Sequence, residues 1–536
     1  MGRYINPPSV GFELVLGGGF YVDKTEMLAY TNAVMNTSRR FVCFTRPRRF
    51  GKTFAAQMLS AFYSKGAQSR HIFEKMKVAH VPENKFPLKL PLYDKYLNRC
   101  NVLFWDMTHF VVNGADKALD LLQTRLLTEL KCEFSEIDAS GINTLADMIC
   151  AVNDATGETF YVIIDEWDLL FREAKNDVSI QKKYINFLRD LFKNAQVAQC
   201  LCGGYMTGIL PIKKYGTSSA LTDFTEFSMV NPRELAEYVG FTTEEVQAIC
   251  EKRGVDFAQM QRWYDGYQFK EVGHVYNPNS VLEASLSKDF VCYWNQTETF
   301  ELLRLYLDLN VEGLKDCVVA MLGGQRCRVD VGSFPNDLVS VDTRDKVLTL
   351  LIHLGYLAYD ADKSEVYIPN EEIREEFVRS FRNGRRSELV KAVQLSDAIL
   401  AATIEKNEDR VAEFLGQVHL AQTSPHFYAN EQVLKTVIAM AYLTAVDHYA
   451  RFEEIGAGRG YADMLFLPVA GSGKPALVIE LKKDHAAQEA VDQIKAKQYI
   501  EVLERHRYHG KVLLVGITFE AKTNHHRCRI EEAALG

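Results

Sequence analysis

The chain has 536 residues, of which 47% are hydrophobic and 25% are charged, an ordinary composition for a soluble protein. Because single hydrophobic cores stop growing near about 250–300 residues, we expect several domains. The formal net charge of -8 excludes a globally basic nucleic-acid-binding protein, so any contact with DNA or RNA has to come from local basic patches.

The cysteines and the apolar runs predict the compartment. Eleven cysteines are scattered from Cys43 to Cys528, and only Cys200 and Cys202 lie close together, a pattern that suits a reducing environment. The first residues lack the pattern of a secretory signal, and no apolar run approaches the roughly 20 residues that cross a bilayer. We therefore expect a cytoplasmic protein without membrane contact, and the sequence leaves oligomerisation open.

The N-terminal part alternates between strand and helix patterns. Short apolar runs at residues 41–44, 102–105 and 160–164 predict buried strands, and residues 117–131 and 181–194 have helical patterns. This alternation is typical of a parallel sheet covered by helices.

A phosphate-binding loop follows the first predicted strand. Gly51, Lys52 and Thr53 stand between that strand and a helix, where backbone N–H groups and the helix N-terminus hold phosphate. Lys52 would reach the β- and γ-phosphates, and Thr53 would bind Mg²⁺. Arg46 stands where the first glycine of the motif belongs. The segment predicts an ATP and Mg²⁺ site, although the Gly-Lys-Thr tripeptide alone also occurs by accident.

Arginines surround this loop. Arg48 and Arg49 lie within it, and Arg39 and Arg40 precede the strand. They are open to three interpretations: phosphate contacts, a finger that reaches another subunit, or a solvated basic rim. We favour contacts with phosphate or a partner, and include Arg46, Arg48 and Arg49 among the nucleotide-binding candidates.

Acidic residues end the strand predicted at 160–164. Asp165 would hold the Mg²⁺ shell, and Glu166 would orient or deprotonate the attacking water. The alternative is a buried strand with acidic residues at its solvated end. Thr207, at the end of a later strand-like run, is a candidate sensor of the γ-phosphate. The order of the two motifs, each next to a strand, favours the functional interpretation.

Changes of pattern divide the chain into five segments. Thr242 and Glu245 form a predicted capping box ahead of a helix. An apolar helix, a hairpin and an acidic helix follow farther on, and together they suggest a winged-helix-like unit. The predicted segments are a phosphate-binding core at 1–230, a helical lid at 231–284, a winged-helix-like region at 285–385, a helical connector at 386–425 and an α/β domain at 426–536.

Six motifs in this order resemble the AAA-ATPase-like family found in gut and other anaerobic bacteria. The motifs are YVDKT (21–25), RPRRFGKT (46–53), IIDEWD (163–168), MTGI (206–209), WYDGYQF (263–269) and VYNP (275–278). In that family the arginine-rich form of the loop is usual. The resemblance implies ATP binding more strongly than ATP hydrolysis.

The C-terminal segment carries a second set of candidates. Asp463 lies in one predicted strand, and Glu480 and Lys482 lie in the next. Because side chains alternate along a strand, Glu480 and Lys482 share a face that Asp463 can join. The carboxylates suit Mg²⁺ or Mn²⁺, and Lys482 could steer or deprotonate a water. A surface Glu-x-Lys pair is the alternative interpretation.

Neighbouring residues favour a site. Glu431 begins an apolar helix and could complete the metal shell, while Gln493, Lys497 and Tyr499 could contact substrate phosphate from a later helix. The arrangement resembles the PD-(D/E)XK nuclease superfamily, which implies a restriction-endonuclease-like α/β fold. Membership does not guarantee cleavage, because such domains also persist as binding modules.

The sequence thus predicts an α/β multidomain protein in which a P-loop NTPase with a parallel sheet precedes a nuclease-like domain. Our leading hypothesis is an ATP-controlled, metal-dependent nuclease that acts on nucleic acid, with DNA favoured over RNA, in defence or mobile-element maintenance. The first alternative is a nucleotide-dependent switch or scaffold that binds nucleic acid or protein without cutting. The second is a toxin or effector.

Overall fold

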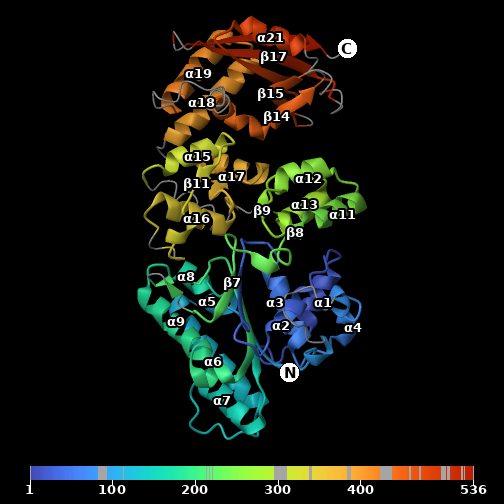
Figure 1. Ribbon diagram of the computed structural model, residues 1–536, viewed down its shortest axis with the longest axis vertical. Coiled ribbons are helices and arrows are strands. Elements are labelled where there is room, and N and C mark those ends of the chain that lie inside the picture. The colour runs from blue at the N-terminus through green and yellow to red at the C-terminus, as the bar shows by residue number, and fades with distance from the viewer. Residues whose placement is uncertain are drawn as a thin grey trace. The chain divides into compact units, whose positions relative to one another are not determined.

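The computed structural model of the protein is shown in Figure 1. It describes the chain apart from residues 1, 82–92, 113, 213, 216–217, 220, 295–310, 337, 339–340, 383–387, 423–436, 458–459, 470–471, 497–502, 504–507, 521–522, 524 and 535–536. The chain divides into two compact units. The first comprises residues 1–293 and 328–369, and the second comprises residues 294–327 and 370–536.

A five-stranded parallel sheet forms the centre of the first unit, as the alternating pattern predicted. In spatial order its strands are β2 (Asn101–Asp106), β3 (Phe160–Asp165), β4 (Leu201–Gly208), β1 (Phe41–Thr45) and β7 (Phe224–Phe227). Strands β1, β3 and β4 are buried along their whole length. They read as continuous apolar runs because helices cover both faces of the sheet.

Helices flank this sheet, with α3 on one face and α6 and α9 on the other (Figure 1). Phe160, Val162 and Ile164 of β3 pack into the core on the α6 and α9 side. Tyr161, on the opposite face, lies against Tyr63 of α3 with ring centroids 4.4 Å apart. The helices are α1 (Val10–Gly17), α2 (Met27–Val34), α3 (Lys52–Tyr63), α4 (Arg70–Phe73), η1 (Lys77–His80), η2 (Tyr93–Lys95), α5 (Thr108–Val111), α6 (Ala115–Glu133), α7 (Leu145–Thr156), α8 (Leu169–Glu173), α9 (Val178–Phe192) and α10 (Ala195–Gln199).

The segment at 231–284 contains helices and also a small sheet that the sequence pattern did not predict. Its elements, after the hairpin β5 (Lys214–Tyr215) and β6 (Ser218–Ser219), are η3 (Arg233–Leu235), β8 (Phe241–Thr242), α11 (Thr243–Arg253), α12 (Phe257–Tyr264), β9 (Tyr267–Phe269), β10 (Gly273–Tyr276) and α13 (Pro278–Ser287). The antiparallel strand order is β8-β10-β9. These strands are two to four residues long, too short to show a periodic pattern. The capping box at Thr242 and Glu245 is confirmed.

The predicted apolar helix, hairpin and acidic helix of the middle region are present. They are α16 (Arg344–Leu354), β12 (Ala358–Asp360) paired with β13 (Glu365–Tyr367), and α17 (Glu371–Arg382). The other elements here are α15 (Leu314–Leu322), β11 (Cys327–Arg328), η4 (Val331–Ser333), α18 (Glu388–Ile404) and α19 (Glu408–Gln422). The first unit contains α16 and the β12–β13 hairpin, whereas the second contains α15 and α17.

A mixed five-stranded sheet forms the C-terminal part of the second unit. Its elements are η6 (Leu443–Asp447), β14 (Tyr449–Ala457), β15 (Gly460–Pro468), β16 (Ala476–Lys483), α21 (Ala487–Ala496), β17 (Lys511–Glu520) and β18 (His525–Ala534), with strand order β14-β15-β16-β17-β18. Only β16 and β17 pair in parallel. The sequence analysis predicted the strands that carry Asp463 and Glu480, which are β15 and β16, but not the edge strands β14 and β18. In β18, charged residues alternate with apolar ones, as in a strand with one solvated face.

Within the described part of the chain, every helix is too short or too polar to cross a membrane.

Candidate nucleotide and metal sites

The carboxyl ends of the parallel strands bring the N-terminal candidates to one edge of the sheet. Strand β4 lies between β1 and β3. Its Thr207 is in register with Phe44 of β1, and Asp106 of β2 is in register with Asp165 of β3. The loop after β1, Thr207 and Asp165 therefore share the edge at which ligands bind in open α/β sheets.

Lys52, at the end of the loop between β1 and α3, bonds back to the backbone of that loop. Gly51 caps α3 with a φ of 91°, a left-handed conformation that glycine adopts without strain. Arg49 also has a positive φ, of 66°. Lys52 is 4% exposed, and its ammonium group donates a hydrogen bond to the Pro47 carbonyl oxygen at 3.1 Å. The loop therefore curls around the Lys52 ammonium, and the α3 N-terminus opens onto the same edge.

Arg46 lies under this loop and is completely buried. Its guanidinium group stacks over the rings of Phe44 and Phe269, 4.6 and 4.9 Å from the centroids, and donates to the Thr45 carbonyl. Burial lowers the pKa of Arg46 to about 9. The guanidinium thus contacts aromatic rings of the loop strand and of β9, a packing role that the sequence did not predict.

The other two loop arginines have different surroundings. Arg49 is exposed and donates to the Asn279 side chain at 3.0 Å, near the start of α13. Arg48 is partly exposed, and its charge acts on Glu166. Of the three arginines, Arg48 is thus the one whose charge acts on the acidic end of β3.

Asp165 is the buried acid at this edge. Burial, together with the charges of Glu166 and Asp106, raises the pKa of Asp165 to about 7, although Thr53 and Lys52 act in the opposite direction. Asp165 Oδ2 is buried and has no hydrogen-bond partner among the described atoms.

Thr207 has a similar environment. Its hydroxyl oxygen is buried and makes no hydrogen bond to the described part of the chain. Buried polar groups are nearly always satisfied in folded proteins. Oxygen donors beside a lysine and a helix N-terminus suit Mg²⁺ and phosphate, so these residues fit an ATP·Mg²⁺ site.

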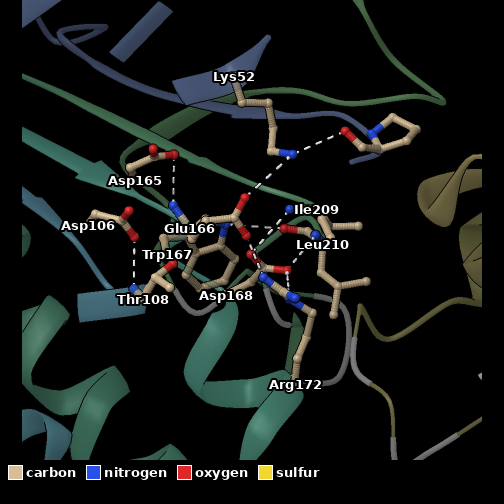
Figure 2. A network of polar contacts seen from close by, with 11 residues as sticks. Lys52, Asp106, Thr108, Asp165, Glu166, Trp167, Asp168, Arg172, Ile209 and Leu210 are labelled. Carbon is tan, nitrogen blue, oxygen red and sulfur yellow. Dashed lines mark hydrogen bonds and ion pairs between the residues drawn. The ribbon is translucent and has the colours of Figure 1, made fainter. Parts of the chain in front are cut away.

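Glu166 is held between two cations (Figure 2). One oxygen lies 3.6 Å from Lys52 Nζ, and the other accepts a hydrogen bond from Arg172. Burial opposes ionisation of Glu166, but the charges of Lys52, Arg172 and Arg48 outweigh it, so the pKa of this carboxyl is lowered. Its φ of 51° is left-handed. Glu166 is therefore an ionised acceptor held in a strained backbone conformation.

Sequence reasoning missed three residues of this cluster. Asp106 ends an apolar strand, as Asp165 does, and that shared pattern could have identified it. Asp168 lies within the IIDEWD motif but received no role. Arg172 lies four residues farther on and has no distinguishing signal in the sequence.

The C-terminal candidates meet across β15 and β16. Met464 pairs with Ile479 in antiparallel register, which brings Asp463 next to Glu480. Asp463 Oδ2 accepts a hydrogen bond from the Leu481 backbone N–H at 2.9 Å. Glu480 is 3% exposed, whereas Lys482 is partly exposed.

Gln493 lies within α21 and donates a hydrogen bond to Glu480 Oε1. Glu431, Lys497 and Tyr499 lie outside the described residues. Among the residues that are described, no three His, Cys, Asp or Glu side chains are grouped so that they could hold a metal ion. Asp463 and Glu480 provide hard oxygen donors that suit Mg²⁺ or Mn²⁺.

Two family matches agree with this arrangement. Residues 12–218 match the family described as predicted AAA-ATPase. Residues 429–528 match the PD-(D/E)XK nuclease superfamily. No curated protein matches the chain. The matched segments contain the β1–α3 loop and the paired strands β15 and β16, respectively. The chain therefore contains a segment that matches the predicted AAA-ATPase family and a segment that matches the PD-(D/E)XK nuclease superfamily, in the order that its motifs predicted.

Proposed function

We propose that the chain binds and hydrolyses ATP at the edge of the parallel sheet, and that ATP binding controls a metal-dependent nuclease site in the C-terminal sheet. The substrate would be nucleic acid, DNA rather than RNA. The observation that carries the proposal is the convergence of Lys52, Asp165 and Glu166 at one edge, with Glu166 kept ionised by neighbouring cations. Such control would suit defence or the maintenance of mobile DNA.

Each residue of the ATP site has a distinct role. Backbone N–H groups of the loop and of the α3 N-terminus bind phosphate, and the Lys52 ammonium exchanges its Pro47 contact for phosphate oxygens. Thr53 and Asp165 would hold Mg²⁺, which when bound neutralises charge on the phosphate oxygens. Glu166 orients the attacking water and accepts its proton. Thr207, between the two motif strands, senses the terminal phosphate.

In the nuclease site, Asp463 and Glu480 would hold the metal, which when bound activates a water toward phosphate. Lys482 steers that water by its charge. Gln493 fixes the Glu480 carboxylate through its hydrogen bond. Glu431 as a further ligand, and Lys497 and Tyr499 as phosphate contacts, remain proposals from the sequence.

A second candidate function is a nucleotide-dependent switch whose C-terminal fold binds nucleic acid without cutting. One observation favours it: both described carboxylates already accept hydrogen bonds from the protein, Asp463 from Leu481 and Glu480 from Gln493. A carboxylate with one oxygen already engaged in this way gains less from binding a metal ion.

The deciding experiment incubates the purified full-length chain with supercoiled plasmid, linear DNA and RNA, with Mg²⁺ or Mn²⁺, and with or without ATP. We expect cleavage of DNA that depends on the metal and changes with ATP. Glu480→Ala should lose cleavage, while Lys52→Ala should lose only the ATP dependence. Binding of nucleic acid without cleavage under every condition would favour the switch.

A further inference from the structure

Asp168 and Arg172 follow the two acidic residues at the end of β3, and the proposed mechanism assigns a role to neither of them. Asp168 precedes α8, and Arg172 lies one turn farther on, within that helix. Asp168 is completely buried, and the side chain of Arg172 is 8% exposed. Asp168 Oδ2 accepts a hydrogen bond from Arg172 Nε at 3.2 Å. Charged groups that are buried to this degree are rare unless they are paired.

Asp168 joins the end of β3 to the end of β4. Its two oxygens accept hydrogen bonds from the backbone N–H groups of Ile209 at 3.2 Å and Leu210 at 2.9 Å. Gly208 permits this approach, because a Cβ at that position would overlap the Asp168 carboxylate. Trp167 adds a further link, since its indole N–H donates to the Leu210 carbonyl at 3.2 Å.

Arg172 extends this connection to Glu166. Its Nε binds Asp168, and its Nη2 donates to Glu166 Oε2 (Figure 2). One planar guanidinium group therefore bridges two carboxylates, a geometry that a lysine ammonium cannot reproduce. The left-handed backbone conformation of Glu166 is unfavourable for a residue with a side chain, so surrounding contacts have to stabilise it.

Lys52 cannot be the lasting partner of Glu166 if it also binds phosphate. In the described structure, Lys52 and Arg172 are the cations in direct contact with the Glu166 carboxylate. When the Lys52 ammonium turns to the phosphates, Arg172 keeps its contact, because it approaches from the α8 side through the other oxygen. Ile209 and Leu210, which directly follow β4, are connected to Glu166 by the same bridge.

We infer that Asp168 and Arg172 are positioning residues that hold Glu166 in place for ATP hydrolysis and link its placement to the segment from Thr207 to Leu210. The inference rests on the proposed ATPase function. Neither residue touches the reacting atoms. Their effect therefore passes through Glu166 and should appear in turnover rather than in nucleotide affinity.

The test compares Arg172→Gln with Lys182→Gln, which removes the same charge from an exposed position on α9. We expect Arg172→Gln to lower kcat by about tenfold to a hundredfold, while KM and the calorimetric affinity for ADP change by less than about twofold. Lys182→Gln should leave all three values unchanged. A kcat for Arg172→Gln within about twofold of the wild type would overturn the inference.

A double-mutant cycle separates positioning from general stabilisation. In a Glu166→Gln background, adding Arg172→Gln should change the residual turnover by less than about twofold, because the group that Arg172 positions is already disabled. If the fold reductions in kcat of the two single variants multiply in the double variant, Arg172 acts independently of Glu166. Gly208→Ala provides a second route if Arg172→Gln does not fold, since it keeps every charged group while its methyl group would overlap the Asp168 carboxylate and the edge of the Trp167 ring. It should give the same loss of kcat.

A crystal structure of Arg172→Gln tests the inference without relying on turnover. We expect the Glu166 carboxylate to move by more than about 1 Å, beyond the tolerance of a positioned catalytic group. An unmoved carboxylate would contradict the inference even if the wild type hydrolyses ATP. Conversely, absence of nucleotide binding and turnover in the wild type would refute the proposed function, while the crystal structure would still decide whether Arg172 positions Glu166.

Discussion

Lys52 provides the most direct residue-scale test of the nucleotide site. Lys52→Ala removes the ammonium that would bind the β- and γ-phosphates, a charge-assisted hydrogen bond of about 1.5–3 kcal/mol. We expect the affinity for ATP·Mg²⁺, measured by calorimetry, to fall by at least about tenfold. Lys182→Ala, at an exposed position on α9, is the control and should bind normally. Unchanged affinity in Lys52→Ala would refute the phosphate-binding loop.

The nuclease residues should separate into two kinds. Asp463→Ala and Glu480→Ala each remove a carboxylate that holds the metal, so both should lose cleavage and bind Mn²⁺ more weakly. Lys482→Ala should also lose cleavage, but it should bind Mn²⁺ as well as or slightly more tightly than the wild type, because a cation near the metal has gone. The assays are plasmid cleavage and Mn²⁺ calorimetry.

The matched control for this set is Lys483→Ala. Lys483 is the next residue of β16, so its side chain points to the opposite face of the sheet. It should cut and bind metal like the wild type. If all three site variants cut normally, the active site lies elsewhere than β15 and β16.

At the residue scale, the sequence identified functional side chains that lie next to a strand recognisable from its apolar run. Lys52, Asp165 and Glu166 follow buried strands, and the structure brings them to one edge. The local pattern could mark Asp106 as an acid at a strand end, but not as a neighbour of Asp165, and Arg172 depends on contacts that no pattern shows. Strand order is a tertiary property that no local pattern contains.

At the scale of elements, the N-terminus of α11 joins two of the sequence motifs. Glu245 accepts a hydrogen bond from the Thr242 N–H at 2.9 Å in the capping box. The same carboxylate lies 2.6 Å from the ammonium of Lys24, from the YVDKT segment. Lys24 also donates to the Glu237 carbonyl oxygen at 2.6 Å. The start of α11 is thus tied to a distant part of the first unit.

Substitutions at Glu245 should separate the two contributions. Glu245→Gln keeps an acceptor for the Thr242 N–H but loses the charge that pairs with Lys24, whereas Glu245→Ala loses both. We expect free energies of unfolding in the order wild type, Gln, Ala, with about 1 kcal/mol for the cap and a further 1–3 kcal/mol for the pair. Urea denaturation measures the order. Equal stability of the Gln and Ala variants would show that the cap contributes nothing.

Long buried strands and capped helices were predictable elements, and short or edge strands were not. Strands β1 to β3 appear in the sequence as continuous apolar runs, because helices cover both faces of the sheet. Strands β8, β9 and β10 are too short to show a period, and β18 carries charged residues on a solvated face. Their pairing is decided by long-range contacts, which override local preference.

At the scale of the whole molecule, the two compact units cannot be separated by one cut. The chain passes between them after residues 293, 327 and 369. The ATP-site candidates lie in the first unit, and Asp463, Glu480 and Lys482 lie in the second. Tests of either site therefore need the full-length chain. ATP·Mg²⁺ then serves as the probe of the first unit, and Mn²⁺ as the probe of the second.

Thermal unfolding of the full-length chain should report the two sites separately. A ligand that binds only the folded state stabilises it by RT ln(1 + [L]/Kd), about 2.7 kcal/mol at a hundredfold excess over Kd. ATP·Mg²⁺, added to the Glu166→Gln variant to prevent turnover, should raise the Tm of one transition, and adding Lys52→Ala should remove that shift. Mn²⁺ without nucleotide should raise the other transition, and Glu480→Ala should remove that shift.

To show that the two sites lie in different units, each variant is also tested with the ligand of the other site. Lys52→Ala should keep the Mn²⁺ shift, and Glu480→Ala should keep the ATP shift, because each substitution alters a group in only one unit. An Mn²⁺ shift that persists in both Asp463→Ala and Glu480→Ala would place the metal elsewhere. If one cooperative transition responds to both ligands, the two units unfold together, and stabilisation at the ATP site is then shared with the nuclease fold.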